Sequence, residues 1–363
     1  MKRGYIYKSD NLFGYAGWPT VGRLSDGRLA CVFSGNRIRH VCPFGKTVIS
    51  YSYDEGETWT PPAPVIDTAF DDRDGGIIAR GNQVLVTSFN NNYPMQREEA
   101  DKYGGKEKQI VLDYIELCED VYDENDVCSS IAVSEDGGNT FPKRYEVPIS
   151  CPHGPIVLKD GRYFYVGRAF GIKQAWRTDK RSYDRLLPDA LYYMFSDDGY
   201  NWTKPVEIPL GPAGDINLFC EPHAIQLSNG EILVHIRVQG PNWGRMYTYQ
   251  TISSENITKW EIPHDVGFAG SPPHLLRHSS GKIICVYGVR EDIILPKGEY
   301  ASVSSDEGKT WGEPIALDTE APDGDLGYPS SVELKDGKIL TAYYQRKKPG
   351  EKNRVKYTIW ELK

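Results

Sequence analysis

The sequence predicts an all-β protein built from six similar units. The chain contains 36 Gly, 24 Pro, 24 Tyr and 8 Trp, and this mixture of turn formers and aromatic residues favours many short strands over helices. A hairpin-like pattern recurs six times, and a second, turn-like pattern recurs between the copies. Repeated self-similarity along a chain is the sequence signature of a repeat architecture.

The first repeat is a hairpin, in which two apolar runs are joined by a polar turn that ends in Gly. Its clear copies are WPTVGRLSDGRLACVF from Trp18, PHGPIVLKDGRYFYVG from Pro152, EPHAIQLSNGEILVHI from Glu221, PPHLLRHSSGKIICVY from Pro272 and YPSSVELKDGKILTAY from Tyr328. A weaker copy, RDGGIIARGNQVLVTS, starts at Arg73. Because the copies are spread over the whole chain, we expect six units of one design.

The second repeat reads Ser-x-Asp-x-Gly-x-Thr-Trp. Residues 52–59 and 304–311 match it fully, and residues 134–141 carry Phe in place of Trp. Residues 196–202 form a copy one residue shorter, and residues 253–260 form a degenerate one. In such a turn the Asp caps backbone N–H groups, the Gly takes a positive φ and the aromatic ring packs back on the sheet. A generic turn explains one copy, whereas three good copies indicate a dedicated motif.

These turns are similar to Asp boxes, and the chain resembles the sialidase (BNR-repeat) superfamily over nearly its full length. The resemblance implies one domain over residues 1–363, a six-bladed β-propeller of four-stranded antiparallel blades, with structural Asp boxes. We expect residues 354–363, which alternate like a strand, to pair near the N-terminus and close the ring. The charged segment 93–127 is an expected insertion in the second blade. It is partly helical and serves as a lid, an oligomer contact or a solvated loop.

Polar and aromatic residues gather where the innermost strands of a propeller would start, around the axis. They are Trp18, Arg73, His153, Glu221, His223, His274 and Tyr328. We expect these side chains to face one pocket, with the three histidines as substrate contacts. Three imidazoles on an axis can also bind a divalent metal. No HxH or HExxH spacing is present, and we expect neither a metal nor another cofactor.

The resemblance also implies catalytic roles. Glu221 in CEPHAIQL and Arg237 in VHIRVQ resemble the Glu and Arg that sialidases carry on paired strands, and Tyr328 in YPSSVELKDG resembles their catalytic Tyr. In that family the Glu polarises the Tyr, which then attacks the anomeric carbon. A phenol with a pKa of about 10 needs such a base nearby. A plain ion pair for Glu221 with Arg237, and a stacking role for Tyr328, are the alternatives.

The chain departs from the family pattern at two positions. Sialidases carry an Arg at the first inner strand that clamps the carboxylate of sialic acid, and this sequence has Trp18 there. Guanidinium groups suit carboxylates because they bind them in a bidentate way. We therefore expect a specificity other than ordinary sialic acid, with Trp18 stacking on a sugar. The acid/base Asp of the family corresponds to His40, which can donate and accept protons near neutral pH.

Further arginines are candidates for holding an anionic group. Arg290 in VYGVRED resembles a third arginine of the family, and Arg168 has the place in its hairpin that Arg237 has in the next one. Arg168 either joins an anion clamp or pairs with a carboxylate. Arg37 and Arg39, on the loop after the first hairpin, either contact the anion or form a solvated basic turn.

We expect an exo-acting glycoside hydrolase that removes a terminal acidic or deoxy sugar from a small oligosaccharide. A lyase that cleaves uronic-acid oligosaccharides by β-elimination and a non-catalytic carbohydrate-binding propeller are the alternatives. The net charge of −8 argues against nucleic acid as a partner. No apolar window is long enough for a membrane span, and a homo-oligomer is a further expectation.

Cysteine usage and the N-terminal sequence bear on the cellular compartment. The seven Cys include no CxxC pair, which argues against a structural zinc site and favours free thiols in a reducing compartment. The N-terminal residues lack the apolar region of a signal peptide. We therefore expect a cytoplasmic protein, or a secreted one if a leader has been removed.

Overall fold

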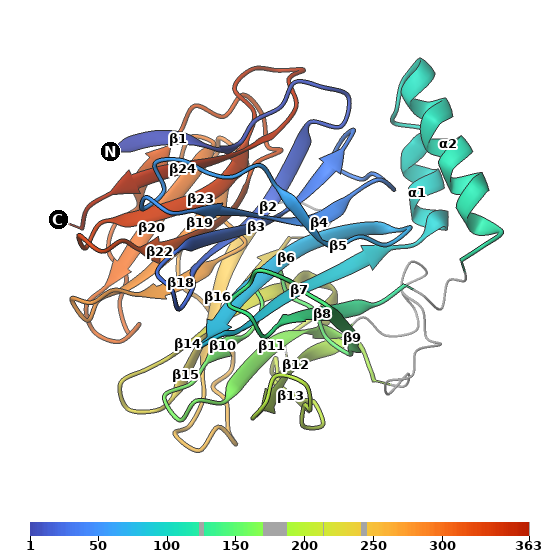
Figure 1. Cartoon of the computed structure of the whole chain (residues 1–363). Coiled ribbons are helices and arrows are strands. Elements are labelled where there is room, and N and C mark those ends of the chain that lie inside the picture. Colours follow the sequence, from blue (N-terminus) through green and yellow to red (C-terminus); the bar gives the residue numbers. More distant parts are fainter. Residues whose placement is uncertain (123–126, 170–186, 213, 241–244, 363) are drawn as a thin grey trace.

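The computed structural model describes residues 1–122, 127–169, 187–212, 214–240 and 245–362. The strands in these residues form six four-stranded sheets, whose neighbouring strands run antiparallel. The sheets are arranged as the blades of a propeller (Figure 1). The expected six-bladed fold is confirmed, and we number the blades in the order of their innermost strands.

The strands of each blade follow one another from the axis outward. Blade 1 holds β2 (Tyr15–Arg23), β3 (Leu29–Arg37), β4 (Lys46–Ser52) and β5 (Ala63–Ile66), and blade 2 holds β6 (Asp71–Arg80), β7 (Gln83–Asn91), β8 (Ser129–Ser134) and β9 (Lys143–Val147). Blade 3 holds β10 (Ile156–Val157), β11 (Tyr163–Ala169), β12 (Ala190–Ser196) and β13 (Val206–Glu207), and blade 4 holds β14 (Phe219–Gln226), β15 (Ile232–Gln239), β16 (Met246–Ile252) and β17 (His264–Asp265). Blade 5 holds β18 (His274–Arg277), β19 (Ile283–Val289), β20 (Gly298–Ser304) and β21 (Ile315–Asp318), and blade 6 holds β22 (Gly327–Glu333), β23 (Ile339–Gln345), β24 (Arg354–Trp360) and β1 (Lys2–Tyr7). The helices are α1 (Tyr93–Ala100), α2 (Gly105–Glu119) and the short 3-10 helix η2 (Ile216–Leu218).

The hairpin repeats supply the two inner strands of the blades. In blade 4, for example, β14 pairs with β15 from Phe219 to Gln226. The second strands are buried along their length, as in β19, whose seven residues are all buried. Adjacent blades cover both faces of such a strand, which explains its continuous run of apolar residues. The innermost strand β2 contacts both β6 and β22.

The Asp boxes form the turns between the third and fourth strands of their blades. In blade 1 the Gly56 N–H donates to Ser52 Oγ over 2.8 Å, and the Thr58 N–H donates to Asp54 Oδ1 over 2.9 Å. The Trp59 indole N–H donates to the Gly56 carbonyl over 3.1 Å. The boxes of blades 2 and 5 repeat the first two of these bonds. The boxes therefore fix turns, which confirms the structural role expected for them.

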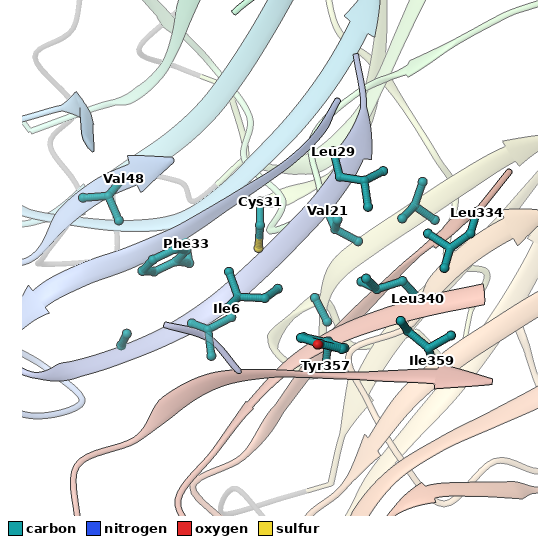
Figure 2. Close-up of a cluster of buried hydrophobic side chains, with 14 residues drawn as sticks. Ile6, Val21, Leu29, Cys31, Phe33, Val48, Leu334, Leu340, Tyr357 and Ile359 are labelled. Carbon is teal, nitrogen blue, oxygen red and sulfur yellow. The ribbon is translucent and has the colours of Figure 1, made fainter. Parts of the chain in front are cut away.

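Blade 6 joins the two ends of the chain. β24 pairs with β1, with Lys2 opposite Ile359, and this confirms the expected closure of the ring. Figure 2 shows the apolar cluster that seals this blade against blade 1, where Leu340 of blade 6 and Phe33 of blade 1 belong to one buried group. Complete burial of one such side chain contributes about 1.5–3 kcal/mol. The seam between the first and last blades is thus closed by strand pairing and by packing.

The insertion in blade 2 forms two helices that stand beside the propeller (Figure 1). Val111 and Ile115 of α2 are fully buried, and they share an apolar cluster with Ile38 and Cys42 of the loop that follows β3. The expected helical content is confirmed, and the alternative of a solvated loop is wrong because one face of α2 is buried. Residues 123–126 of the insertion lie outside the described residues.

Three features of the fold concern other classes of site. None of the helices in the described ranges is long and apolar enough to cross a bilayer. The seven cysteines all lie in those ranges, and none of them forms a disulfide. Within the same residues, no group of three or more His, Cys, Asp or Glu could hold a metal ion.

Candidate active site on the propeller axis

Four blades present a side chain at the axis through the same backbone distortion. Trp18, Asp74, Glu221 and Tyr328 have φ values of 56°, 51°, 49° and 51°, a region that residues other than Gly rarely adopt. Each lies at a shift in register between the two inner strands of its blade. The conformation costs of order 1–3 kcal/mol per residue and persists only where the surroundings enforce it. Such strain collects at functional sites.

Glu221, Arg237 and Tyr328 form one hydrogen-bonded group. The Tyr328 hydroxyl donates to Glu221 Oε1 over 2.6 Å. Arg237 Nη1 donates to Glu221 Oε2 over 2.5 Å and to Tyr328 Oη over 3.1 Å. Gln239 Oε1 accepts from Arg237 Nη2 over 2.6 Å and fixes the guanidinium. The predicted partners are therefore in contact, and the carboxylate of Glu221 is placed to take the phenolic proton.

Burial keeps Tyr328 protonated at rest. Its side chain is 5% exposed, and burial raises the pKa of its phenol well above 10.0, with a further contribution from the Glu221 carboxylate. Arg237 and Arg290 act in the opposite direction because their positive charges favour a phenolate. The phenol must therefore lose its proton to a neighbour during a reaction, and Glu221 is the base in contact with it.

Arg290 is a buried cation beside Tyr328. Its guanidinium lies 5.4 Å from the centre of the Tyr328 ring. Its Nε and Nη2 atoms are buried and have no hydrogen-bond partner among the described residues. Buried polar atoms without a partner are costly. Arg290 is therefore well suited to bind an anionic group of a ligand.

The structure contradicts two expectations around Trp18. Trp18 is only 1% exposed, and the guanidinium groups of Arg73 and Arg37 lie 4.2 Å and 4.9 Å from its ring. Its faces are occupied, so it is not available to stack on a sugar. Arg37 is fully buried in an ion pair with Asp71 at 2.6 Å, so it does not reach a substrate. Sequence reasoning missed this because Arg37 lies at the end of β3, not on the loop where it was expected, and Arg73 comes from another blade.

His40 forms a pair with a carboxylate that the sequence did not indicate. Its Nδ1 lies 2.9 Å from Asp325 Oδ1, and its side chain is 43% exposed. Asp325 also accepts from the Tyr15 hydroxyl over 3.0 Å and from Arg346. The carboxylate orients the imidazole, so that Nδ1 carries a proton and Nε2 is the nitrogen that exchanges protons. The ring packs on Trp18 at 4.8 Å between centroids, which places it beside the Tyr328 group.

The repeats and the ring of blades agree with a comparison with known families. The model of the BNR repeat-like domain matches residues 147–359, which is more than half of the chain. The chain belongs to the BNR repeat-like domain family. The matched residues include Glu221, Arg237 and Tyr328, whereas His40 precedes them. No curated protein matches the sequence.

Solved structures share the fold of this BNR-repeat propeller. A protein of unknown function from Dyadobacter fermentans is 20% identical, with a TM-score of 0.74, and the match covers 100% of this chain and 98% of that one. A sialidase from Trypanosoma rangeli is 16% identical, with a TM-score of 0.64, over 99% of this chain and 59% of that one. An intramolecular trans-sialidase from Ruminococcus gnavus is 14% identical, with a TM-score of 0.65, over 99% and 96%. At these identities the likeness shows the fold alone.

Two further residues of the BNR-repeat propeller join the site: Arg73, which was expected at the axis, and Asp74, which sequence reasoning did not name. Asp74 is 4% exposed, and its Oδ1 has no hydrogen-bond partner in the described part of the chain. Burial, with the charge of Glu221, raises the pKa of Asp74 to about 6 against the opposing effect of Arg73. Arg73 stacks on Trp18 and donates to the His40 carbonyl over 3.0 Å. The weakest hairpin copy carries both residues, and its alignment with the other copies indicated Arg73 but did not single out Asp74.

Arg39 and Arg168 are engaged away from the Tyr328 group. Arg39 donates to the Lys102 carbonyl and lies 4.9 Å from the Tyr103 ring, so it ties the His40 loop to the helical insertion. Arg168 forms two bonds to Asp189, of 2.8 Å and 2.7 Å. This is the carboxylate pairing considered as the alternative to an anion clamp. The expectation that these two arginines bind substrate is therefore not supported.

The three axial histidines gather as expected, but in a different place. His153, His223 and His274 have ring centroids 4.3–5.6 Å apart, and each is at most 7% exposed. They line a cavity whose described lining residues include neither Glu221 nor Tyr328. The innermost strands continue past the site, so these side chains lie deeper along the axis. They are not substrate contacts of the Tyr328 group.

Proposed function

We propose that this protein is an exo-acting glycoside hydrolase that removes a terminal acidic sugar through a covalent intermediate on Tyr328. The observation that carries the proposal is the 2.6 Å hydrogen bond from the Tyr328 hydroxyl to Glu221, with Arg237 bonded to both. A buried phenol in contact with a carboxylate base can act as a nucleophile once the base takes its proton. The sialidase-like propeller fold supports a role in carbohydrate chemistry.

In the first step, Tyr328 Oη bonds to the anomeric carbon while the bond to the leaving oxygen breaks. The phenolic proton passes to Glu221, and His40 Nε2 gives a proton to the leaving oxygen. In the second step, His40 takes a proton from water, whose oxygen displaces Tyr328 from the sugar. Glu221 returns its proton to the phenolate, so the protein ends as it began.

An anionic group on the substrate follows from the charges beside Tyr328. Arg237 and Arg290 flank the phenol, and Arg73 from blade 2 contributes a third positive charge that acts on Tyr328. We propose that Arg73 supplies the charge absent at position 18, since its guanidinium covers Trp18. A carboxylate on the sugar is the natural ligand of such a cluster. The arrangement differs from one with an arginine at position 18, so we propose a specificity distinct from ordinary sialic acid.

A panel of aryl glycosides tests the proposal. Sialic acid, uronic acid and deoxysugar reporters are incubated with the wild type, with Tyr328→Phe and with Tyr200→Phe, a matched control in an Asp box. We expect aglycone release from an acidic reporter by the wild type and the control, and loss of release in Tyr328→Phe. New ultraviolet absorbance without aglycone release would instead indicate a β-eliminating lyase. Binding without any turnover would indicate a carbohydrate-binding propeller.

A further inference from the structure

A cavity at the innermost strands is lined by the three axial histidines, and its described lining includes neither Glu221 nor Tyr328. It has a volume of about 440 Å³. Lys159 and Arg277, near the turns of blades 3 and 5, also belong to its lining. No step of the proposed hydrolysis uses this cavity, so its polar groups need a separate explanation.

Two of the histidines each use one ring nitrogen to accept a hydrogen bond from the backbone. The Leu275 N–H donates to His223 Nδ1 over 2.9 Å, and the Ser331 N–H donates to His274 Nδ1 over 3.4 Å. Each bond satisfies a backbone N–H on the innermost strand of the next blade, which has no strand partner toward the axis. Backbone N–H groups can only donate, so both Nδ1 atoms are acceptors. In a neutral imidazole the proton then resides on Nε2.

His223 and His274 therefore present two Nε2–H donors. Burial and the neighbouring imidazoles lower the pKa of both rings well below 6.5, so the neutral form with this fixed tautomer applies. The rings stack with centroids 4.3 Å apart, which holds the two donors close together. No partner for either Nε2 is found in the part of the chain that the structure describes.

His153 has the opposite tautomer. Its Nε2 is buried and has no hydrogen-bond partner among the described residues. The Thr20 hydroxyl lies 3.1 Å from His153 Nδ1 and 3.2 Å from the Pro152 carbonyl. Because that hydroxyl donates its only proton to the Pro152 carbonyl, it accepts from His153 Nδ1, and His153 Nε2 carries a lone pair instead of a proton.

Such a cluster suits an anion and does not suit a metal. A metal needs an imidazole lone pair, and the lone pairs of His223 and His274 are already used by backbone N–H groups. The cavity lining also carries a positive charge, which suits an anion. Lys159 Nζ donates to the Leu227 and Ser228 carbonyls, both at 2.9 Å, and no carboxylate in the described ranges forms an ion pair with it.

We propose that the cavity binds a small monovalent anion through the Nε2–H groups of His223 and His274, with Lys159 as a positive charge in the same lining. Halide and formate-sized ions fit the chemistry, because the two stacked rings hold their Nε2–H donors close together. The site is distinct from the proposed catalytic centre and does not depend on the reaction assigned to it.

Bromide is the probe for this site. Crystals of the full chain soaked in sodium bromide should show an anomalous peak within hydrogen-bond distance of His223 and His274 Nε2. In solution, titration with bromide at constant ionic strength, with gluconate as the balancing anion, should show one saturable site. Absence of the peak, or ordered water alone at that position, would overturn the proposal.

Variants connect the binding to the named groups. His223→Phe keeps a ring but removes the donor, and it should weaken bromide binding at least roughly tenfold. Lys159→Gln should weaken it several-fold, whereas Lys309→Gln, an exposed lysine in an Asp box, should leave it unchanged. If His223→Phe does not fold, the bromide affinity of Lys159→Gln and the anomalous peak in the crystal test the proposal. Equal affinity in Lys159→Gln and Lys309→Gln, or binding of zinc at the three rings, would contradict an anion site.

Discussion

The Tyr328 hydroxyl donates to Glu221 Oε1 over 2.6 Å across 107 residues of sequence. The two residues occupy equivalent places in blades 6 and 4, and both have a left-handed backbone. The same distortion of the innermost strand therefore directs both side chains toward one point, which explains how they come into contact. The contact is also specific, because Arg237 bonds to both partners.

The first prediction concerns Glu221 as the base. Glu221→Gln keeps an oxygen that can accept the Tyr328 hydrogen bond but cannot take the proton. We expect kcat on an acidic reporter to fall by roughly 10²–10⁴-fold, the usual contribution of a positioned base. Glu231→Gln, on the turn between β14 and β15, is the matched control and should retain activity. Equal activity of the two variants would show that Glu221 is only an ion-pair partner.

The second prediction concerns Arg290 as an anion contact. Its buried Nε and Nη2 atoms have no protein partner among the described residues, so the variant Arg290→Met should fold. A hydrogen bond to a charged group contributes about 1.5–3 kcal/mol, so KM for an acidic reporter should rise roughly 10- to 150-fold. An uncharged amide of the same sugar should bind the variant and the wild type alike. An equal loss with both reporters would argue against a carboxylate contact.

The third prediction is a pH dependence set by His40. Partial burial, with the charges of Arg73 and Arg290, lowers the pKa of His40 below 6.5 against the opposing effect of Asp325. The protonated form of His40 is needed in the first step, so kcat/KM should fall as the pH rises through the pKa of His40. Asp325→Asn removes a carboxylate that favours the protonated ring.

The falling limb should therefore move to lower pH in Asp325→Asn, and it should disappear in His40→Asn, which retains little activity. His278→Asn, a histidine near the turn of blade 5, should leave the pH profile unchanged. A limb that stays in place in Asp325→Asn would assign the titration to another group.

The sequence predicted the blades more completely than the contacts between residues that lie far apart in the sequence. Hairpin repeats and Asp boxes follow from local turn chemistry, and the family resemblance named Glu221, Arg237 and Tyr328, which the structure brings into contact. Asp325 was missed because it lies outside the repeats and meets His40 across 285 residues. Local sequence cannot report such a contact.

Two further errors have the same physical origin. Trp18 was expected to stack on a sugar, but Arg73 of the next blade covers its ring. The histidines were expected at the substrate, but His223 serves the backbone of Leu275 in the neighbouring blade. In both cases the partner belongs to another blade, and the packing of the blades around the axis decides the role.

The fourth prediction tests how closely the blades approach one another. A Cβ atom on Gly76 would lie 2.3 Å from the Gly154 backbone nitrogen and 2.5 Å from the His153 carbonyl carbon. Backbone atoms cannot give way easily, so Gly76→Ala should lower the free energy of unfolding by about 1–3 kcal/mol. Chemical denaturation measures the change. Gly337→Ala is not a suitable control, because its positive φ adds strain of its own.

Ser228→Ala, in the exposed turn between β14 and β15, provides a baseline for a surface change. Its effect on unfolding should stay within about 0.5 kcal/mol. A Gly76→Ala protein as stable as Ser228→Ala would show that blades 2 and 3 can separate at the axis without cost.

The most direct test of the account is to locate the covalent intermediate. A fluorinated glycosyl fluoride of the acidic sugar selected by the reporter panel should react with the wild type and slow the second step. Mass spectrometry of the digested protein should then find the sugar on the peptide that carries Tyr328, and Tyr328→Phe should remain unlabelled. A label on another residue, or turnover of the reporter with no covalent species at Tyr328, would contradict the account.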